Sequence, residues 1–215
     1  MSFTNVIFDL DGTLIDSLPG ITASTQYALD RHLPERSAAD IRTVIGPPVR
    51  TMFATLWPEI GSDQLDLLVA AFREHYDTRG CLLSPMYPEV AGTLARLAEA
   101  GTTMFVLTNK PLAPARTILE QHRIAKHFRR IVSPDAVTPP LTRKAEGAEL
   151  LQHEHQLAPA STIVVGDGMD DLDAAKACSF AFAIAAYGYG GATRAPVSAL
   201  IPRVKTFSEL VGLVL

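Results

Sequence analysis

The sequence predicts an α/β protein in which a doubly wound, parallel, Rossmann-like sheet carries a small all-helical cap domain inserted after its first strand. Short apolar runs rich in β-forming residues alternate with longer helical patterns, which is typical of a parallel sheet. The stretch 17–85 breaks this alternation, because it holds helical patterns and chain breakers but no convincing buried strand. We therefore expect a core formed by residues 1–16 and 86–215 and a helical cap at 17–85.

The individual elements follow from the same patterns. In the cap, Ser37 could cap a short helix that runs through Ile45, and Ser62 could cap one that runs to Thr78. In the core, helical patterns lie at 89–100, 112–123, 143–156 and 171–177. The expected strands lie at 4–8, 103–107, 130–132, 162–165 and 180–184.

Composition narrows the class of protein. The 215 residues suffice for a core and a small second domain, and 47% hydrophobic with 20% charged residues is an ordinary globular balance. The net charge of −4 disfavours a protein that binds nucleic acid or anionic membranes mainly through charge. Cys81 and Cys178 are isolated, so we expect buried thiols rather than a disulfide. With no leader-like start and no bilayer-length apolar run, we expect a cytoplasmic protein without nucleic-acid or membrane partners.

The strongest motif, FDLDGTLIDS at 8–17, begins where the first expected strand ends. Asp9 and Asp11 point to one side of an extended segment, and ligands of open α/β sheets bind at that strand end. Thr13 could orient one of the carboxylates. A calcium-binding loop is a poor alternative, because its twelfth position, counted from Asp9, is Gly20 rather than Glu.

A second acidic motif, VGDGMDDLDAAK at 165–176, also follows an apolar strand. Four acids in seven residues repel one another, and a divalent cation with hard oxygen ligands, such as Mg²⁺, would relieve that repulsion. Asp167 follows the strand directly and is the better ligand. We assign Asp170 and Asp173 instead to the N-terminus of the following helix, where its dipole favours acids.

Donors for a phosphate group lie between the two acidic motifs. Thr108, Asn109 and Lys110 follow the strand expected at 103–107, and Lys144 lies near the start of a helix. A hydroxyl and an ammonium at strand ends are the donors that a bound phosphate needs. Each of these residues alone is weak evidence for a phosphate-binding site. The interpretation depends on their order along the chain.

That order resembles the haloacid dehalogenase superfamily of phosphotransferases over nearly the whole chain. The first family motif matches DLDGT at 9–13, the second matches Thr108, and the fourth matches GD at 166–167 with Asp171 four residues on. The expected helical insertion lies where the family carries its cap. The resemblance implies an active site at the carboxyl ends of the central strands.

The resemblance also implies roles for single residues. Asp9 would be the nucleophile that forms an aspartyl-phosphate, and Asp11 would act first as general acid and then as base. Thr108 and Asn109 would bind the transferring phosphoryl group. Lys144 would stabilise both this group and the nucleophile.

A Mg²⁺ site follows from the resemblance as well. The Asp9 carboxylate, the Asp11 backbone carbonyl and Asp167 would hold the ion, with Asp171 supporting the site. A carboxylate is a poor nucleophile toward a dianionic phosphate because both are negative, and a bridging cation cancels much of that repulsion.

The third family motif departs from the common pattern. Many relatives have Lys followed by Pro, whereas the sequence here is RKAE at 143–146. We take Lys144 for this role because it opens a helix in a suitable position. Arg143 and Lys110 are the alternatives.

Two further segments could border the site. GPPVR at 46–50 is a stiff turn that could aim the guanidinium of Arg50 at a substrate anion. YGYGG at 187–191 follows the last expected strand, and phosphoglycolate phosphatase-like relatives have a similar run. The glycine-rich run could instead be only a turn, and Arg50 could instead be an ordinary surface arginine.

We expect a Mg²⁺-dependent phosphatase acting on a small phosphorylated metabolite, such as phosphoglycolate or a sugar phosphate. A sugar phosphomutase of the same superfamily is the main alternative, and a non-catalytic phospho-binding module is another. A haloacid dehalogenase proper is disfavoured by Asp11, since that enzyme type lacks this acid.

Overall fold

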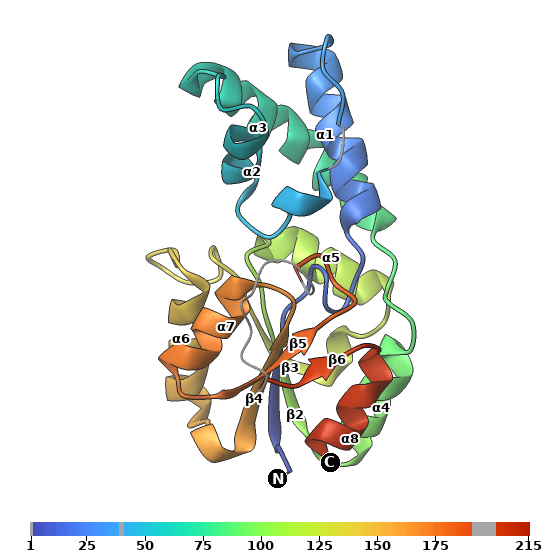
Figure 1. Ribbon diagram of the computed structural model, residues 1–215, viewed down its shortest axis with the longest axis vertical. Coiled ribbons are helices and arrows are strands. Elements are labelled where there is room, and N and C mark those ends of the chain that lie inside the picture. The colour runs from blue at the N-terminus through green and yellow to red at the C-terminus, as the bar shows by residue number, and fades with distance from the viewer. Residues whose placement is uncertain (1, 39–40, 191–200) are drawn as a thin grey trace. The chain divides into compact units, whose positions relative to one another are not determined.

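The computed structural model describes residues 2–38, 41–190 and 201–215 and divides into two compact units (Figure 1). The core unit comprises Met1–Ile15 and Met86–Leu215, and the helical unit comprises Asp16–Pro85. The core unit contains a six-stranded sheet whose paired strands all run parallel. The prediction of an α/β fold built on a parallel sheet is therefore confirmed.

The strands follow the order β3-β2-β1-β4-β5-β6 across the sheet. In the centre, β1 pairs with β2 and with β4, so that Phe8 lies opposite Val106 and Val165. The chain thus winds outward from β1 in two directions, and the switch point, where ligands of such sheets bind, falls at the carboxyl ends of β1 and β4. The strand bounds are β1 Asn5–Phe8, β2 Thr103–Leu107, β3 Phe128–Val132, β4 Thr162–Gly166, β5 Ala181–Ala185 and β6 Arg203–Val204.

Helices cover both faces of the sheet. Figure 1 shows α6 and α7 side by side on one face, and α4 with α8 on the other. Short 3-10 helices precede β3, β4 and α8. The α-helices of the core unit are α4 Val90–Glu99, α5 Leu112–Gln121, α6 Lys144–His155, α7 Met169–Ala177 and α8 Leu210–Val214.

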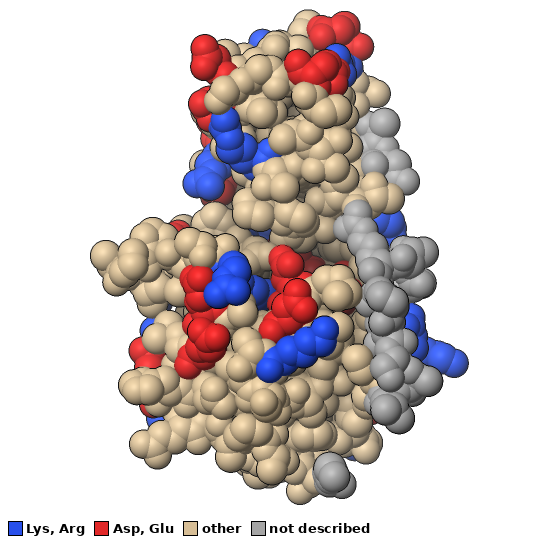
Figure 2. Space-filling model, turned by 60° about the vertical axis from the view of Figure 1, so that its left-hand side comes forward, with Lys and Arg blue, Asp and Glu red and all other residues tan. Residues whose placement is uncertain are grey.

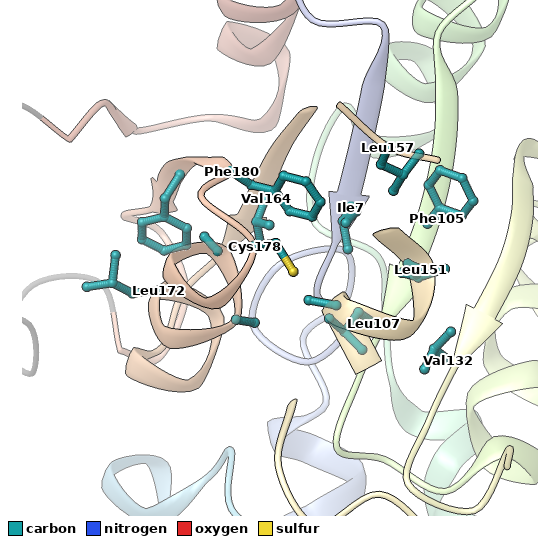
Figure 3. Close-up of a cluster of buried hydrophobic side chains, with 14 of the residues drawn as sticks. Ile7, Phe105, Leu107, Val132, Leu151, Leu157, Val164, Leu172, Cys178 and Phe180 are labelled. Carbon is teal, nitrogen blue, oxygen red and sulfur yellow. The ribbon is translucent and has the colours of Figure 1, made fainter. Parts of the chain in front are cut away.

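A cluster of buried hydrophobic side chains fixes α6 and α7 to the sheet (Figure 3). It explains why the strand sequences are almost continuously apolar, since a sheet covered on both faces buries both sides of each strand. The free thiol of Cys178 belongs to this cluster, and burial raises its pKa to about 11. Cys81, in the helical unit, is also free and buried, so both thiols are as predicted. The labelled members of the cluster are Ile7, Phe105, Leu107, Val132, Leu151, Leu157, Val164, Leu172, Cys178 and Phe180.

The helical unit contains only helices and connecting turns in its described residues: α1 Leu18–His32, η1 Arg42–Val44, α2 Val49–Leu56, α3 Ser62–Tyr76 and η2 Gly80–Leu83. The helix expected from Ser37 to Ile45 is wrong for the described residues, because only the 3-10 turn η1 forms there. Residues 39 and 40 lie outside the described chain. Ser62 is the first residue of α3 rather than its cap, which is Gly61.

Aromatic packing and one polar cluster hold the helical unit together. Phe53 stacks on Trp57 and meets Phe72 edge to face, so that α2 packs against α3. Between α1 and α3, the Tyr27 hydroxyl donates to Glu74 over 2.7 Å, and Arg31 pairs with the same carboxylate at 3.0 Å. These contacts join α1 to α3, two helices that are far apart in the sequence.

Candidate active site

Three carboxylates and one ammonium meet at the carboxyl ends of β1 and β4. Asp9 directly follows β1, Asp167 directly follows β4, and Asp171 lies in the first turn of α7. One carboxylate oxygen of each lies within 4.8 Å of those of the other two. Lys144, the first residue of α6, places its Nζ 2.5 Å from Asp9 Oδ1 and 2.6 Å from Asp171 Oδ1. All four residues are buried, so the structure brings these predicted site residues together.

This set of donors fits a hard divalent cation. When all groups are ionised, three negative charges face the single positive charge of Lys144, and two negative charges remain. Buried charge without compensation is costly, and carboxylate oxygens are the ligands that Mg²⁺ prefers. Asp9, Asp167 and Asp171 are therefore the residues that could hold the ion. A contribution from the Asp11 carbonyl remains a prediction.

The electrostatics of the cluster agree with that interpretation. Burial raises the pKa of Asp9 well above its ordinary value; Lys144 partly offsets this, and the charges of Asp171 and Asp167 add to it. Burial, followed by the charge of Asp171, raises the pKa of Asp167 to about 6. Burial opposes the charged form of Lys144, but Asp171 and Asp9 outweigh it and raise the pKa of the ammonium. The two carboxylates therefore favour the protonated, charged form of Lys144.

The turn after β5 clamps Asp167 through its backbone. The amides of Tyr189 and Gly190 donate to Asp167 Oδ2 over 2.6 and 3.0 Å. Gly12 adopts a φ of +85°, and a Cβ there would lie 2.3 Å from the same oxygen. The two amides therefore fix the orientation of the Asp167 carboxylate. The sequence marked this glycine-rich run only as a possible border of the site; Gly191, its last residue, lies outside the described chain.

Tyr187 connects that turn to the first motif. Its hydroxyl donates to the Thr13 carbonyl over 2.9 Å, and its ring meets Tyr87 edge to face. Burial raises the pKa of Tyr187, which keeps the phenol protonated as a donor. Thr13 in turn directs its hydroxyl toward Asp9 Oδ2 at 3.5 Å, as expected from its place in the motif.

The loop after β2 holds Thr108 and Asn109, the residues of the second family motif and its neighbour. Thr108 Oγ1 accepts the amide of Lys110 over 3.1 Å, so the hydroxyl proton can be donated elsewhere. Asn109 Nδ2 donates to Asp170 over 3.0 Å and thereby ties this loop to α7. Direct binding of a phosphoryl group by Thr108 and Asn109 remains a prediction.

The three cations considered for the third motif have different partners. Lys144 contacts Asp9, Lys110 Nζ lies 3.1 Å from Asp11 Oδ1, and Arg143 is exposed and pairs with Glu146. The geometry therefore favours Lys144 for the place beside Asp9, the predicted nucleophile. The pair of Lys110 with Asp11 was not expected from the sequence.

Arg50 lies in the helical unit, near the start of α2. Its guanidinium pairs with Asp66 and donates to Ser62 Oγ over 2.9 Å, so it joins α2 to α3. Its expected contact with a substrate anion remains a prediction.

The sequence contains similar numbers of acidic and basic residues, and both kinds lie on the surface. On the face drawn in Figure 2, acidic and basic side chains of the core unit lie beside one another. In the part of the chain that the structure describes, no helix is long and apolar enough to cross a membrane. A cytoplasmic location stays a prediction.

Comparisons with known proteins identify the family. The profile of the haloacid dehalogenase-like hydrolases matches residues 6–185. The chain belongs to this family, and the predicted resemblance is confirmed.

Individual relatives show which members of the family the chain is similar to. The chain is 34% identical to a phosphoglycolate phosphatase of Vibrio parahaemolyticus over 97% of this chain and 95% of that protein. A solved structure from Haemophilus somnus, described as a predicted phosphoglycolate phosphatase, has a TM-score of 0.84 at 26% identity and covers 100% and 99% of the two chains. The structure of protein tyrosine kinase A from Mycobacterium tuberculosis has a TM-score of 0.77 at 29% identity, over 99% and 98%. The chain is thus an enzyme of the hydrolase family, similar to phosphoglycolate phosphatases.

Proposed function

We propose that the protein is a Mg²⁺-dependent phosphatase that hydrolyses a small phosphorylated metabolite through an aspartyl-phosphate on Asp9. The observation that carries this proposal is the contact of Lys144 with both Asp9 and Asp171, beside Asp167. A buried carboxylate in contact with an ammonium group, among oxygen ligands for a divalent cation, is suited to attack an anionic phosphate.

Asp9, Asp167 and Asp171 would hold the metal, with the Asp11 carbonyl as a further ligand. When bound, Mg²⁺ would cancel the repulsion between the Asp9 carboxylate and the phosphate and stabilise charge on the transferring group. The clamp on Asp167 Oδ2 supports this assignment, because it orients the other oxygen of that carboxylate.

The reaction would proceed in two halves. In the first, an Asp9 carboxylate oxygen attacks phosphorus, the bond from phosphorus to the leaving oxygen breaks, and the Asp11 carboxyl gives its proton to that oxygen. In the second, the Asp11 carboxylate takes a proton from water, the water oxygen attacks phosphorus, and the bond to Asp9 breaks. Inorganic phosphate leaves, and both aspartates return to their starting states.

Two donors would stabilise the transferring phosphoryl group. The Lys144 ammonium can donate to it while remaining next to Asp9, and the Thr108 hydroxyl has its proton available. Donors fixed before the reaction stabilise developing charge without having to reorganise.

The substrate would be a small phosphate monoester, of the phosphoglycolate or sugar phosphate class. The relatives named phosphoglycolate phosphatase support that class. We assign recognition of the part that does not react to the helical unit, as a cap, with Arg50 as the candidate contact to an anionic group.

A panel of phosphate esters tests the proposal. The protein is incubated with 2-phosphoglycolate and several hexose phosphates, in Mg²⁺ or in EDTA, and all products are identified. We expect inorganic phosphate in Mg²⁺ and none in EDTA. Isomerised sugar phosphate with little free phosphate would indicate a mutase. Binding without any product would indicate a non-catalytic module, and full activity in EDTA would contradict the metal site.

A further inference from the structure

Lys110 is a buried cation that the proposed reaction does not yet use. Its side chain is 5% exposed, and its Nζ lies 3.1 Å from Oδ1 of Asp11, whose side chain is 16% exposed. An ammonium is costly to bury unless a partner compensates it. Asp11 provides that compensation at the rim of the site.

The position of this pair follows from the topology. Asp11 lies three residues beyond the end of β1, and Lys110 lies three residues beyond the end of β2. These strands are direct neighbours in parallel register, so their carboxyl-end turns meet. Lys110 therefore reaches Asp11, while Lys144 arrives from α6 to contact Asp9.

We propose that Lys110 is a positioning residue that holds Asp11 for proton exchange with the leaving oxygen. The contact of the ammonium with Oδ1 orients the Asp11 carboxyl group, so that Oδ2 is the oxygen available for proton exchange. This inference rests on the proposed function, and it gives Lys110 a part in the first half-reaction distinct from that of Lys144.

The consequence depends on the leaving group. When the bond between phosphorus and the leaving oxygen breaks, a strongly basic oxygen needs the proton from Asp11, whereas a weakly basic one departs as a stable anion. If Asp11 is misplaced, hydrolysis should therefore become slower for esters of basic alcohols and phenols, and should change little for esters of acidic phenols. A residue that binds the phosphoryl group would affect both kinds of ester alike.

Three aryl phosphates of similar shape test this difference. Phenyl, 4-nitrophenyl and 2,4-dinitrophenyl phosphate are mixed with excess enzyme in Mg²⁺, and release of the phenol is followed in a single turnover. For Lys110→Met, we expect release from phenyl phosphate to slow about tenfold or more, and release from 2,4-dinitrophenyl phosphate to change less than about twofold. Lys110→Arg, which keeps the charge, should retain most of the wild-type dependence on the leaving group.

Matched variants separate positioning from folding. Lys176→Met removes an exposed lysine whose Nζ lies 3.7 Å from Asp173, and it should leave all three rates unchanged. Asp11→Asn should show the same steep dependence as Lys110→Met, and the double variant should be no worse than Asp11→Asn.

The outcomes are distinct. Equal losses on all three esters, no loss on phenyl phosphate, or additive effects in the double variant would overturn the role of Lys110. If the wild-type enzyme released neither phenol from these esters nor phosphate from 2-phosphoglycolate and the hexose phosphates, the proposed function itself would fail.

Discussion

Lys144 and Asp9 are 135 residues apart in the sequence, yet Nζ and Oδ1 lie 2.5 Å apart in the core of the site. The contact requires β1 at the centre of the sheet and α6 with its first residue directed at the end of that strand. It makes Lys144 the group on which the charge balance of the site depends.

Replacing Lys144 by Met should therefore affect turnover and stability together. Losing one preorganised donor to the transferring group should slow turnover about a hundredfold or more on every substrate. Breaking a buried ion pair should also lower the free energy of unfolding by about 3–5 kcal/mol in metal-free protein. Urea unfolding and steady-state rates measure the two effects.

Arg143→Met is the matched control. Arg143 is adjacent in sequence, but its side chain is 72% exposed. Its removal should change stability by less than about 0.5 kcal/mol. If both variants behaved alike, Lys144 would have no special place in the site.

The metal-free protein should become less stable as the pH rises. The pKa of Asp167 is raised to about 6, so the folded state holds a proton that the unfolded state releases near pH 4. Since the folded state binds more protons in this range, stability falls between these two values. We expect Mg²⁺ to raise Tm clearly at pH 7 and little at pH 5, as measured by calorimetry.

The variant Asp167→Asn separates the contribution of Asp167 to the pH dependence of stability from that of other titrating groups. The variant should lose most of the Mg²⁺-induced rise in Tm at pH 7 and show a flatter pH dependence without metal. A rise that is equal at both pH values in the wild type would argue against buried acidic ligands.

The clamp on Asp167 predicts a role for the backbone in metal affinity. In Gly190→Ala, the new Cβ would lie 2.2 Å from the Asp167 carbonyl oxygen, so the turn must move and release Oδ2. We expect Mg²⁺ affinity, measured by titration calorimetry, to fall about 10–100-fold. Gly92→Ala, in α4 with open space around its Cβ, should leave affinity unchanged and add up to about 1 kcal/mol of stability. If the Mg²⁺ affinity of Gly190→Ala were unchanged, the backbone contacts to Asp167 would have no role in metal binding.

Arg50 has two candidate roles that substitution can separate. If it contacts an anionic part of the substrate, Arg50→Ala should lower kcat/KM for 2-phosphoglycolate about 10–100-fold and leave 4-nitrophenyl phosphate nearly unchanged. Asp66→Ala breaks the same ion pair from the other side. Identical losses in both variants would show that Arg50 serves only the packing of α2 on α3.

The sequence predicted the features that local patterns encode. Apolar runs ending in acids located β1 and β4, and the residues directly after them, Asp9 and Asp167, are the ones that meet. The strand β6, with only two residues, carries no periodic pattern and was missed. Helix α7 begins at Met169, two residues earlier than predicted, because its cap is Gly168, whose amide donates to Asp171 rather than offering a side-chain signal.

Other features depend on strand order, which local patterns do not encode. The pairing of Lys110 with Asp11 requires β2 beside β1, and the grip of Tyr189 and Gly190 on Asp167 requires β5 beside β4. The sequence could mark these segments as polar or glycine-rich, but their partners follow only from the assembled sheet.

The identity of the residue that carries phosphate tests the central claim most directly. Enzyme is mixed with substrate in Mg²⁺, quenched in acid within milliseconds, and digested for peptide mass spectrometry. We predict phosphate on Asp9 in the wild type and none in Asp9→Asn. With 2,4-dinitrophenyl phosphate, whose leaving group needs no proton from Asp11, Asp11→Asn should carry more phosphate than the wild type, because water is activated poorly. Phosphate on another residue, or near-normal turnover in Asp9→Asn, would contradict the account.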